Sequence, residues 1–471
     1  MTQLSVNDLY VISDLHIGGK DRQIFAGKAE LPWLVDDLRA KAKPENTIAL
    51  VINGDFIDFL AEDDAKYFDA DGAVNKLNRI AADPTFSATF AALGRFANEP
   101  HCTLVINLGN HDLELCLPEV QAAFVSCCAI NDARLVIWVD DGVGVRVKVG
   151  ARDVLCLHGN EADVTNHVDF DRLREIKRAR QTGKPIETAK AASWIPNAGT
   201  QLVIDAMNPI KKQHPFIDVL KPEDQAAIRV LLALDYERAK SLAAPAFKAM
   251  FIRGGKDRIK NWFGLLSEDE ILAGGIPKLA GGQGWLDDID EDYKNSGRRA
   301  LTELERQGSL GAIDDFKFAW EKWRGRDGTQ ALREALKELA KDRSFAVGES
   351  EKMNEDLLEF VDPDLHFLCS GHTHFARSLS RGLSTHHFNS GTWAYLMKIE
   401  DDTREDSEKF GLMIAALRNK ATLEQLAKDN FLIKQLTVIR IKQKDKQHSV
   451  GELFDVKDQQ WTRIPNTQRT I

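Results

Sequence analysis

Five short segments of this sequence carry side chains that bind divalent metal ions. They are Asp14-Leu15-His16, Gly54-Asp55, Gly109-Asn110-His111-Asp112, His158-Gly159 and Gly371-His372-Thr373-His374. Carboxylate oxygens combined with imidazole nitrogens favour borderline ions such as Mn²⁺, Fe²⁺ or Zn²⁺ over the all-oxygen shells that Mg²⁺ and Ca²⁺ prefer. The residue types therefore predict a divalent-metal site, provided that the fold brings the five segments together.

Asp55 is the residue best suited to bridge two ions. Two divalent ions about 3.5–4 Å apart need a shared anion, and a carboxylate can both bridge them and offset their charge. Asp55 follows Gly54, where the backbone can turn sharply. Taken singly, Asp14 and Asp55 could be helix N-caps or turn residues. The histidines that accompany them favour the metal interpretation.

Each of these segments follows a short apolar run that is typical of a buried strand. The runs are Leu9–Ser13, Thr47–Asn53, Cys102–Leu108, Val154–Leu157 and Leu365–Cys369. Segments between the first three runs, Leu31–Ala42 and Asn75–Ala97, have apolar residues at helical spacing. In an α/β sheet, ligands bind just beyond the carboxyl ends of the strands. An α/β sandwich would therefore gather the five segments at one edge.

The sequence divides into a split catalytic domain and a helical insertion. We predict a catalytic domain from residues 1–164 and 361–471, and an insertion, or cap, over residues 165–360. The insertion has helical patterns at Phe170–Thr182, Asp224–Ala239, Ile313–Trp323 and Gln330–Asp342, with a glycine-rich break at 274–284. The end of the chain predicts a helix at Leu423–Asn430 and strands around Leu436–Ile441 and Glu452–Val456.

The five segments, in this order, resemble the motifs of the calcineurin-like metallophosphoesterases. The resemblance covers roughly residues 8–160 and 362–395. It implies a four-layer α/β/β/α sandwich and the hydrolysis of a phosphate ester or phosphoanhydride at two divalent ions. Mn²⁺ is the first choice for these ions, with Fe or Zn as alternatives.

The resemblance also implies a role for each residue. Asp14, His16 and His374 would hold one ion, Asn110, His158 and His372 the other, and Asp55 would bridge them. A metal-bridging hydroxide would attack phosphorus in line. His111 would act as general acid, or as a cation that stabilises phosphoryl charge, and Asp112 would orient it.

Some residues near these motifs keep two interpretations. Relatives often read HGD or HGH where this chain has His158-Gly159-Asn160, so an acidic residue that supports the ligands is moved or replaced here. Asp58 could line the site or serve in a turn or cap. His386 and His387 are adjacent, so on a strand they face opposite sides and a spare ligand is not expected. Asn389-Ser390-Gly391 resembles a closing turn beside the site.

Bulk properties narrow the class of protein. The chain has 471 residues, 43% hydrophobic and 28% charged, as in ordinary globular proteins. Its formal net charge of −10 argues against a protein devoted to duplex DNA. No run approaches the roughly 20 apolar residues that span a bilayer, no secretory signal opens the sequence, and the cysteines show no disulfide-like spacing. A cytoplasmic location is predicted, and peripheral contact with a membrane stays open.

The substrate class is left open among phosphate-containing molecules, namely nucleotides, sugar nucleotides, lipids and oligonucleotides. UDP-2,3-diacylglucosamine diphosphatases carry a smaller helical lid at the same place, but typically have arginine where this chain has His111. A nuclease or nucleotide phosphodiesterase is the runner-up class, like the repair exonucleases that share the GNHD motif but usually place their cap after the last motif. A non-catalytic scaffold is a further alternative, although every expected ligand is present. The basic residues at 172–180 and 253–260 could form a solvated face or a surface for a phosphate-bearing ligand.

Overall fold

The computed structural model describes residues 4–163, 166–183, 194, 196–221, 230, 234, 332–333, 345–350, 352–382, 384–399 and 401–471. The chain forms two compact units. The first consists of residues Met1–Ile204, Asp342–Met397 and Ala427–Ile471, and the second of Asp205–Lys341 and Lys398–Leu426.

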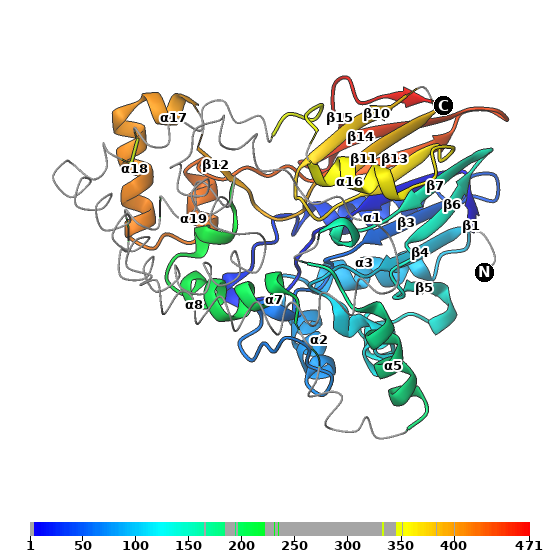
Figure 1. The fold of residues 1–471 in the computed structure, drawn as a ribbon, viewed down its shortest axis with the longest axis horizontal. Helices are drawn as coiled ribbons and strands as arrows, with labels where there is room; N and C mark the ends of the chain where they lie inside the picture. The colour runs from blue at the N-terminus through cyan, green and yellow to red at the C-terminus, as the bar shows by residue number, and fades with distance from the viewer. Residues whose placement is uncertain are drawn as a thin grey trace, which may run out of the picture. The chain divides into compact units, whose positions relative to one another are not determined.

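The first unit contains two β-sheets and the helices that accompany them (Figure 1). Its strands are β1 (Leu4–Val6), β2 (Asp8–Ile12), β3 (Ile48–Asn53), β4 (Cys102–Asn107), β5 (Val136–Val139), β6 (Val145–Val149), β7 (Arg152–Cys156), β9 (Phe367–Ser370), β10 (Ala376–Arg381), β11 (Thr385–Ser390), β13 (Thr437–Gln443), β14 (Ser449–Lys457), β15 (Gln460–Arg463) and β16 (Arg469–Thr470). Its helices are α1 (Glu30–Lys41), α2 (Ala73–Ala82), α3 (Ser87–Ala97), α4 (Pro118–Cys127), α5 (Phe170–Gln181), α7 (Ala198–Leu202) and α16 (Lys352–Phe360). Short 3-10 helices include η2 (Phe59–Ala61), η3 (Leu113–Cys116) and η5 (Asn160–Ala162).

The larger sheet has the order β15-β14-β13-β2-β3-β4-β5, with β16 beside β14. Strands β2 to β5 are parallel, whereas β13 pairs antiparallel with β2, so that strands from both ends of the chain lie side by side (Figure 1). All residues of β2 and β3 are buried, which explains their nearly continuous apolar sequences. Because β2 to β5 run parallel, their carboxyl ends lie at the same edge of the sheet.

The smaller sheet has the order β1-β6-β7-β9-β11-β10. Strands β7, β9 and β11 are parallel neighbours. The core between the two sheets contains Val11 and Val51 from the larger sheet, and Val154 and Phe367 from the smaller one.

Helices cover the outer faces of both sheets. Helices α1 and α3 contact β3 and β4 of the larger sheet. On the other side, Leu357 of α16 packs with Leu155 of β7 and Leu368 of β9. Leu155 and Leu368 alternate along their strands with residues that face the core between the sheets, as the pleat requires. The predicted α/β sandwich, with two sheets between helices, is confirmed.

The basic residues of α5 pair with acids of their own unit. Arg172 lies 2.7 Å from Glu175, Arg174 lies 2.8 Å from Asp171, and Arg180 lies 2.5 Å from Asp71. Lys177 forms an ion pair with Asp140. These contacts favour the interpretation of this basic stretch as a solvated, self-paired face.

The second unit contains several short described elements and one helix of 12 residues. They are α8 (Asn208–Lys211), β8 (Leu220–Lys221), α17 (Asp401–Glu405) and α18 (Ser407–Arg418), while β12 (Met397–Lys398) and α19 (Leu423–Lys428) stand at its boundaries. The helices predicted at 224–239, 313–323 and 330–342, the glycine-rich break at 274–284 and the basic stretch at 253–260 lie almost wholly outside the described residues. Among the residues described, no helix combines the length and apolarity needed to cross a membrane.

Candidate metal centre

The parallel register brings three of the five segments to one edge of the larger sheet. Ile12 of β2 pairs with Ile52 of β3, which pairs with Ile106 of β4, so Asp14, Asp55 and Asn110 follow neighbouring strand ends. The backbone pairing continues past β2, because the amide N–H groups of Asp14 and His16 donate to the carbonyls of Gly54 and Asp55. From the smaller sheet, β7 leads to His158 and β9 leads to His372 and His374.

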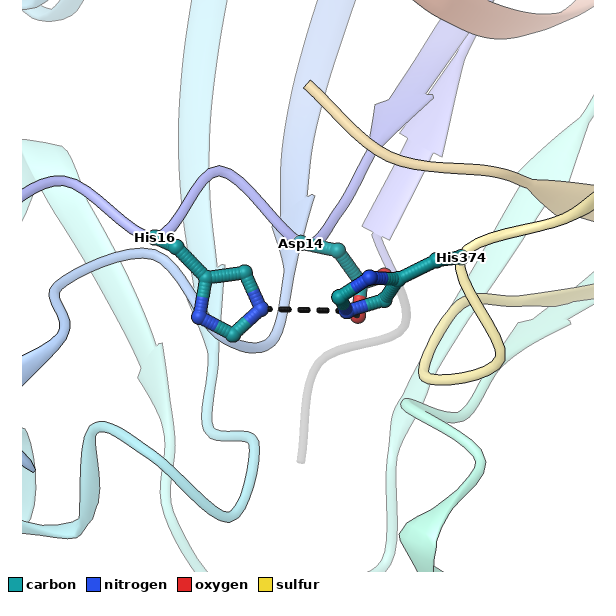
Figure 2. Close-up of side chains that lie close together, drawn as sticks. All are labelled: Asp14, His16 and His374. Atoms are coloured by element: carbon teal, nitrogen blue, oxygen red, sulfur yellow. Dashed lines mark hydrogen bonds and ion pairs between the residues drawn. The ribbon is translucent and has the colours of Figure 1, made fainter. Parts of the chain in front are cut away.

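Asp14, His16 and His374 form one group of candidate ligands. Figure 2 shows the three side chains pointing toward one another from the loops after β2 and β9. His16 Nε2 lies 3.1 Å from His374 Nε2, and His374 Nε2 lies 3.3 Å from Asp14 Oδ1. Two ligands that share an ion with bond lengths of about 2.1 Å are separated by such distances.

Asp55 links this group to a second one. Its Oδ2 lies 3.8 Å from His16 Nε2 on one side and 3.3 Å from His158 Nε2 on the other. Asp55, His158 and His372 offer ligand atoms within 4.8 Å of one another, and the rings of His158 and His372 lie 5.2 Å apart. One carboxylate oxygen therefore faces both groups.

The hydrogen bonds of His158 leave a position that a cation would fill. Its Nδ1 lies 2.8 Å from the carbonyl oxygen of Asn53, which can only accept, so Nδ1 carries the proton. In the neutral ring, Nε2 then presents a lone pair to the Asp55 carboxylate. In the described part of the chain, His158 Nε2 and Asn110 Oδ1 are buried without a hydrogen-bond partner. Two buried acceptors beside a carboxylate fit a bound cation, because unpaired buried acceptors are otherwise costly.

Most of the candidate ligands adopt left-handed backbone conformations. The φ angles are 53° at Asp14, 48° at His16, 51° at Asp55, 70° at His372 and 65° at His374. Such angles are uncommon for residues with a Cβ atom, and they concentrate at functional sites where the surrounding structure enforces them. The backbone therefore turns these side chains toward a common centre at a local energetic cost.

Two glycines allow the strand ends to approach one another. A Cβ atom at Gly54 would lie 2.2 Å from Nδ1 of His158, and one at Gly109 would lie 2.2 Å from Oδ1 of Asp55. Gly54 also has a φ of 89°, which disfavours any other residue. The glycine of the GD segment thus makes room for the histidine of the HG segment.

Comparison with known protein families decides what kind of domain carries this centre. Residues 8–219 match the family model of the calcineurin-like phosphoesterases. The chain contains a calcineurin-like phosphoesterase domain. The match begins at β2, takes in the first four ligand segments and ends before His372 and His374. No curated protein matches the chain.

Within the phosphoesterase domain, the buried charges around Asp55 keep this carboxylate ionised. Burial disfavours the charged form of Asp55, but His158 and His111 hold the pKa of that carboxyl well below its usual range. Burial also disfavours the His158 imidazolium, but the Asp55 carboxylate raises the pKa of His158 to about 10. Without an ion, a proton on His158 therefore offsets the carboxylate charge, and protons compete with metal for this position.

His111 adjoins the candidate ligands and is held by Asp58. Its ring lies 4.9 Å from that of His16, and its Nδ1 lies 3.3 Å from Asp58 Oδ1. Asp58 also accepts from His16 Nδ1 at 3.2 Å and from the backbone N–H groups of Leu60 and Ala61. Asp58 therefore lines the site and caps η2 at the same time.

Asp112 contacts the backbone of two loops, whereas the resemblance implied that it would orient His111. Its two oxygens accept from the backbone N–H groups of Phe56, at 2.8 Å, and Gly109, at 2.7 Å. Asp112 thus joins the Gly54-Asp55 loop to the Gly109–Asp112 loop, while the His111 ring contacts the carboxylate of Asp58. Burial, with the nearby Asp55, raises the pKa of Asp112 to about 7.

The remaining sequence candidates lie beside the centre or away from it. Asn389 Nδ2 donates to the carbonyl of Gly371 at 2.7 Å, which fits a supporting role. His386 is hydrogen-bonded to Ser378 and His387 to Ser370, and neither histidine belongs to a candidate metal group among the described residues. Ser13, which the sequence did not single out, contacts the Asp14 carboxylate and lies 2.6 Å from the Ser390 hydroxyl.

A second cluster of buried charges lies behind the Gly109–Asp112 loop. Glu114 of η3 is buried and accepts from the backbone N–H of Asp69 at 2.9 Å. Asp69 in turn lies 2.9 Å from Nζ of the fully buried Lys76. Burial raises the pKa of Glu114 from its ordinary 4.5 to about 7.

Glu114→Gln is expected to remove a pH-dependent loss of stability. Because the folded-state pKa lies above the unfolded value, the stability that protonated Glu114 contributes is present below about pH 4.5 and is lost as the pH rises through about 7. One pKa unit corresponds to about 1.4 kcal/mol, so the free energy of unfolding should fall by about 3 kcal/mol more in the parent chain than in the variant. Denaturant unfolding from pH 4.5 to 8 measures this, with the exposed Glu45→Gln as control. Parallel pH profiles for the parent and Glu114→Gln chains would contradict the assignment.

Proposed function

We propose that this protein is a metal-dependent phosphoesterase that hydrolyses a phosphate ester or phosphoanhydride at two divalent ions. Asp14, His16 and His374 would hold one ion, Asn110, His158 and His372 the other, and Asp55 both. The proposal is carried by Asp55 Oδ2, which lies between His16 Nε2, at 3.8 Å, and His158 Nε2, at 3.3 Å. The membership of the domain in the calcineurin-like phosphoesterases supports the same reaction class.

The two ions, when bound, lower the pKa of water and offset the charge that develops on the phosphoryl oxygens. The chain's own residues would supply the proton and the positioning. Asp58, hydrogen-bonded to Nδ1 of His111, would orient that ring so that Nε2 can give a proton to the leaving oxygen. Asp112 would hold the loops of Asp55 and His111 at a fixed spacing through its two backbone contacts.

We also propose that residues 165–360 form an inserted cap that selects the substrate. In the sequence this segment starts soon after His158 and ends shortly before His372, so both of its ends lead directly from candidate ligands. A segment in that place can shape the pocket and exclude water during the reaction. Nucleotides, sugar nucleotides, lipids and oligonucleotides remain the candidate substrates.

Removal and return of the metal provides the direct test. Chelated protein should lose hydrolysis of bis-(4-nitrophenyl) phosphate and of 4-nitrophenyl phosphate, because both candidate groups would then lack their ions. Mn²⁺ should restore the activity, and Mg²⁺ should restore it poorly because imidazole ligands suit Mg²⁺ badly. The measurement is nitrophenolate release, with metal content followed on the same samples.

The ratio of the two rates separates a diesterase from a monoesterase, and a panel of the four substrate classes follows with the better metal. Activity that survives complete chelation would contradict the proposal. Equal restoration by Mg²⁺ and Mn²⁺ would contradict the assigned imidazole ligands.

A further inference from the structure

Asp163 touches a candidate metal ligand from outside the centre. Its Oδ2 lies 3.1 Å from Nε2 of His372. A carboxylate oxygen can only accept, so this contact places a proton on Nε2 and leaves Nδ1 of His372 as the ring nitrogen with a free lone pair. His372 belongs to the second group of candidate ligands, together with Asp55 and His158.

The Asp163 carboxylate is held in place by its own segment. Nδ2 of Asn166 donates to the same Oδ2 at 2.7 Å, and the backbone N–H of Asn166 donates to the carbonyl of Asp163 at 3.0 Å. Asn160 is fully buried, and its carbonyl accepts from the backbone N–H of Asp163. Its Nδ2 donates to the carbonyl of Asn166 at 3.2 Å. Asn160, Asp163 and Asn166 are therefore joined to one another by hydrogen bonds, and these contacts fix the carboxylate.

We propose that Asp163 is a positioning residue for the second metal ion, acting through His372. A carboxylate on the outer nitrogen of a ligating histidine fixes the tautomer and the ring orientation and increases the basicity of the ligand. The 3.1 Å contact on Nε2 supplies this arrangement, and the Asn166 contact explains why Asp163 does not need to join the centre as a ligand. The inference rests on the proposed function, because it assumes that His372 binds an ion.

Asn166 also contacts the start of α7, within the proposed cap. Asn166 packs tightly against Gly199 of α7, where an added Cβ atom would lie 1.8 Å from Asn166 Oδ1. Asn197, the residue before α7, donates to the carbonyl of His167. Asn197 and Gly199 thus lie against the segment of Asn166, the residue that donates to the Asp163 carboxylate.

The test compares Mn²⁺ binding to the full-length parent chain, Asp163→Ala and Asp163→Asn, without substrate. In Asp163→Ala, one of the two Mn²⁺ ions should bind about 10–100-fold more weakly, and the other should keep its affinity. At intermediate Mn²⁺, the electron paramagnetic resonance spectrum should change from that of a coupled pair to that of a single ion. Asp163→Asn, which keeps an acceptor but loses the charge, should show a smaller loss, as should Asn166→Ala.

Asp445→Ala is the matched control, because Asp445 contacts His448 at 3.0 Å in an exposed hairpin with no candidate ligand. It should bind both ions as the parent does. The inference is overturned if Asp163→Ala keeps both affinities, or if it loses both ions equally along with the thermal stability of the metal-free protein. A parent chain that binds no pair of Mn²⁺ ions would overturn the proposed function as well, so the two failures are distinguishable.

Discussion

The Asp55→Asn variant is expected to purify without its pair of metal ions and to lose phosphoesterase activity by at least about a thousandfold. The neutral amide removes the charge between His16 and His158, whose Nε2 atoms lie 3.8 and 3.3 Å from Asp55 Oδ2. Two divalent ions would then repel each other without a shared anion. Because the metals supply several kcal/mol of transition-state stabilisation, and each 1.4 kcal/mol is tenfold in rate, the loss should reach that size.

The measurements are metal content after dialysis, Mn²⁺ affinity and hydrolysis of bis-(4-nitrophenyl) phosphate. Asp8→Asn is the matched control, since Asp8 is equally buried and lies on β2, at the end opposite to Asp14, where it pairs with Arg440 at 2.7 and 2.9 Å. It should lower stability but keep both ions. An Asp55→Asn chain that retains two ions at the parent affinity would refute the bridging role.

His111→Ala is expected to keep both ions and to lower turnover by at least about a hundredfold. His111 contacts Asp58 and adjoins His16, but the ions have other ligands in the proposed assignment. A general acid contributes about 10²–10⁴-fold, and the contribution is smallest for leaving groups that depart without a proton. The loss should therefore be larger for a phenyl ester than for the corresponding 4-nitrophenyl ester.

The control for this variant is His448→Ala, an exposed histidine that also contacts an aspartate. It should leave turnover unchanged. Loss of metal from His111→Ala would show that His111 is a ligand. An equal loss for both esters would favour a role in stabilising phosphoryl charge over proton donation.

The sequence predicted the gathering of the ligand segments for a simple physical reason. Parallel strands end at one edge of a sheet, so Asp14, Asp55 and Asn110 had to lie near one another once β2, β3 and β4 were recognised as neighbours. Short apolar runs, each followed by turn residues, were enough to recognise those strands.

Other features depend on contacts that no local pattern encodes. Asp163 contacts His372, which lies more than 200 positions later in the sequence, and is held there by Asn166. The roles of Asp58 and Asp112 depend on which groups their carboxylates contact. Asp58 contacts the His111 ring, whereas Asp112 accepts from the backbone N–H groups of Phe56 and Gly109. Helix α18 is different, because a local pattern does encode it although it was not predicted. Its buried residues are at helical spacing, namely Phe410, Met413, Ile414 and Leu417.

The place of β13 beside β2 has a consequence for how the protein is made. The ribosome produces β2 long before β13, so the main-chain groups along one side of β2 stay unpaired while the segments between these two strands emerge. Such an exposed strand edge invites pairing with other nascent chains, and contacts between distant residues slow folding. The newly made polypeptide is therefore expected to need chaperone protection until β13 has been made, and shortened forms that end before β13 should aggregate.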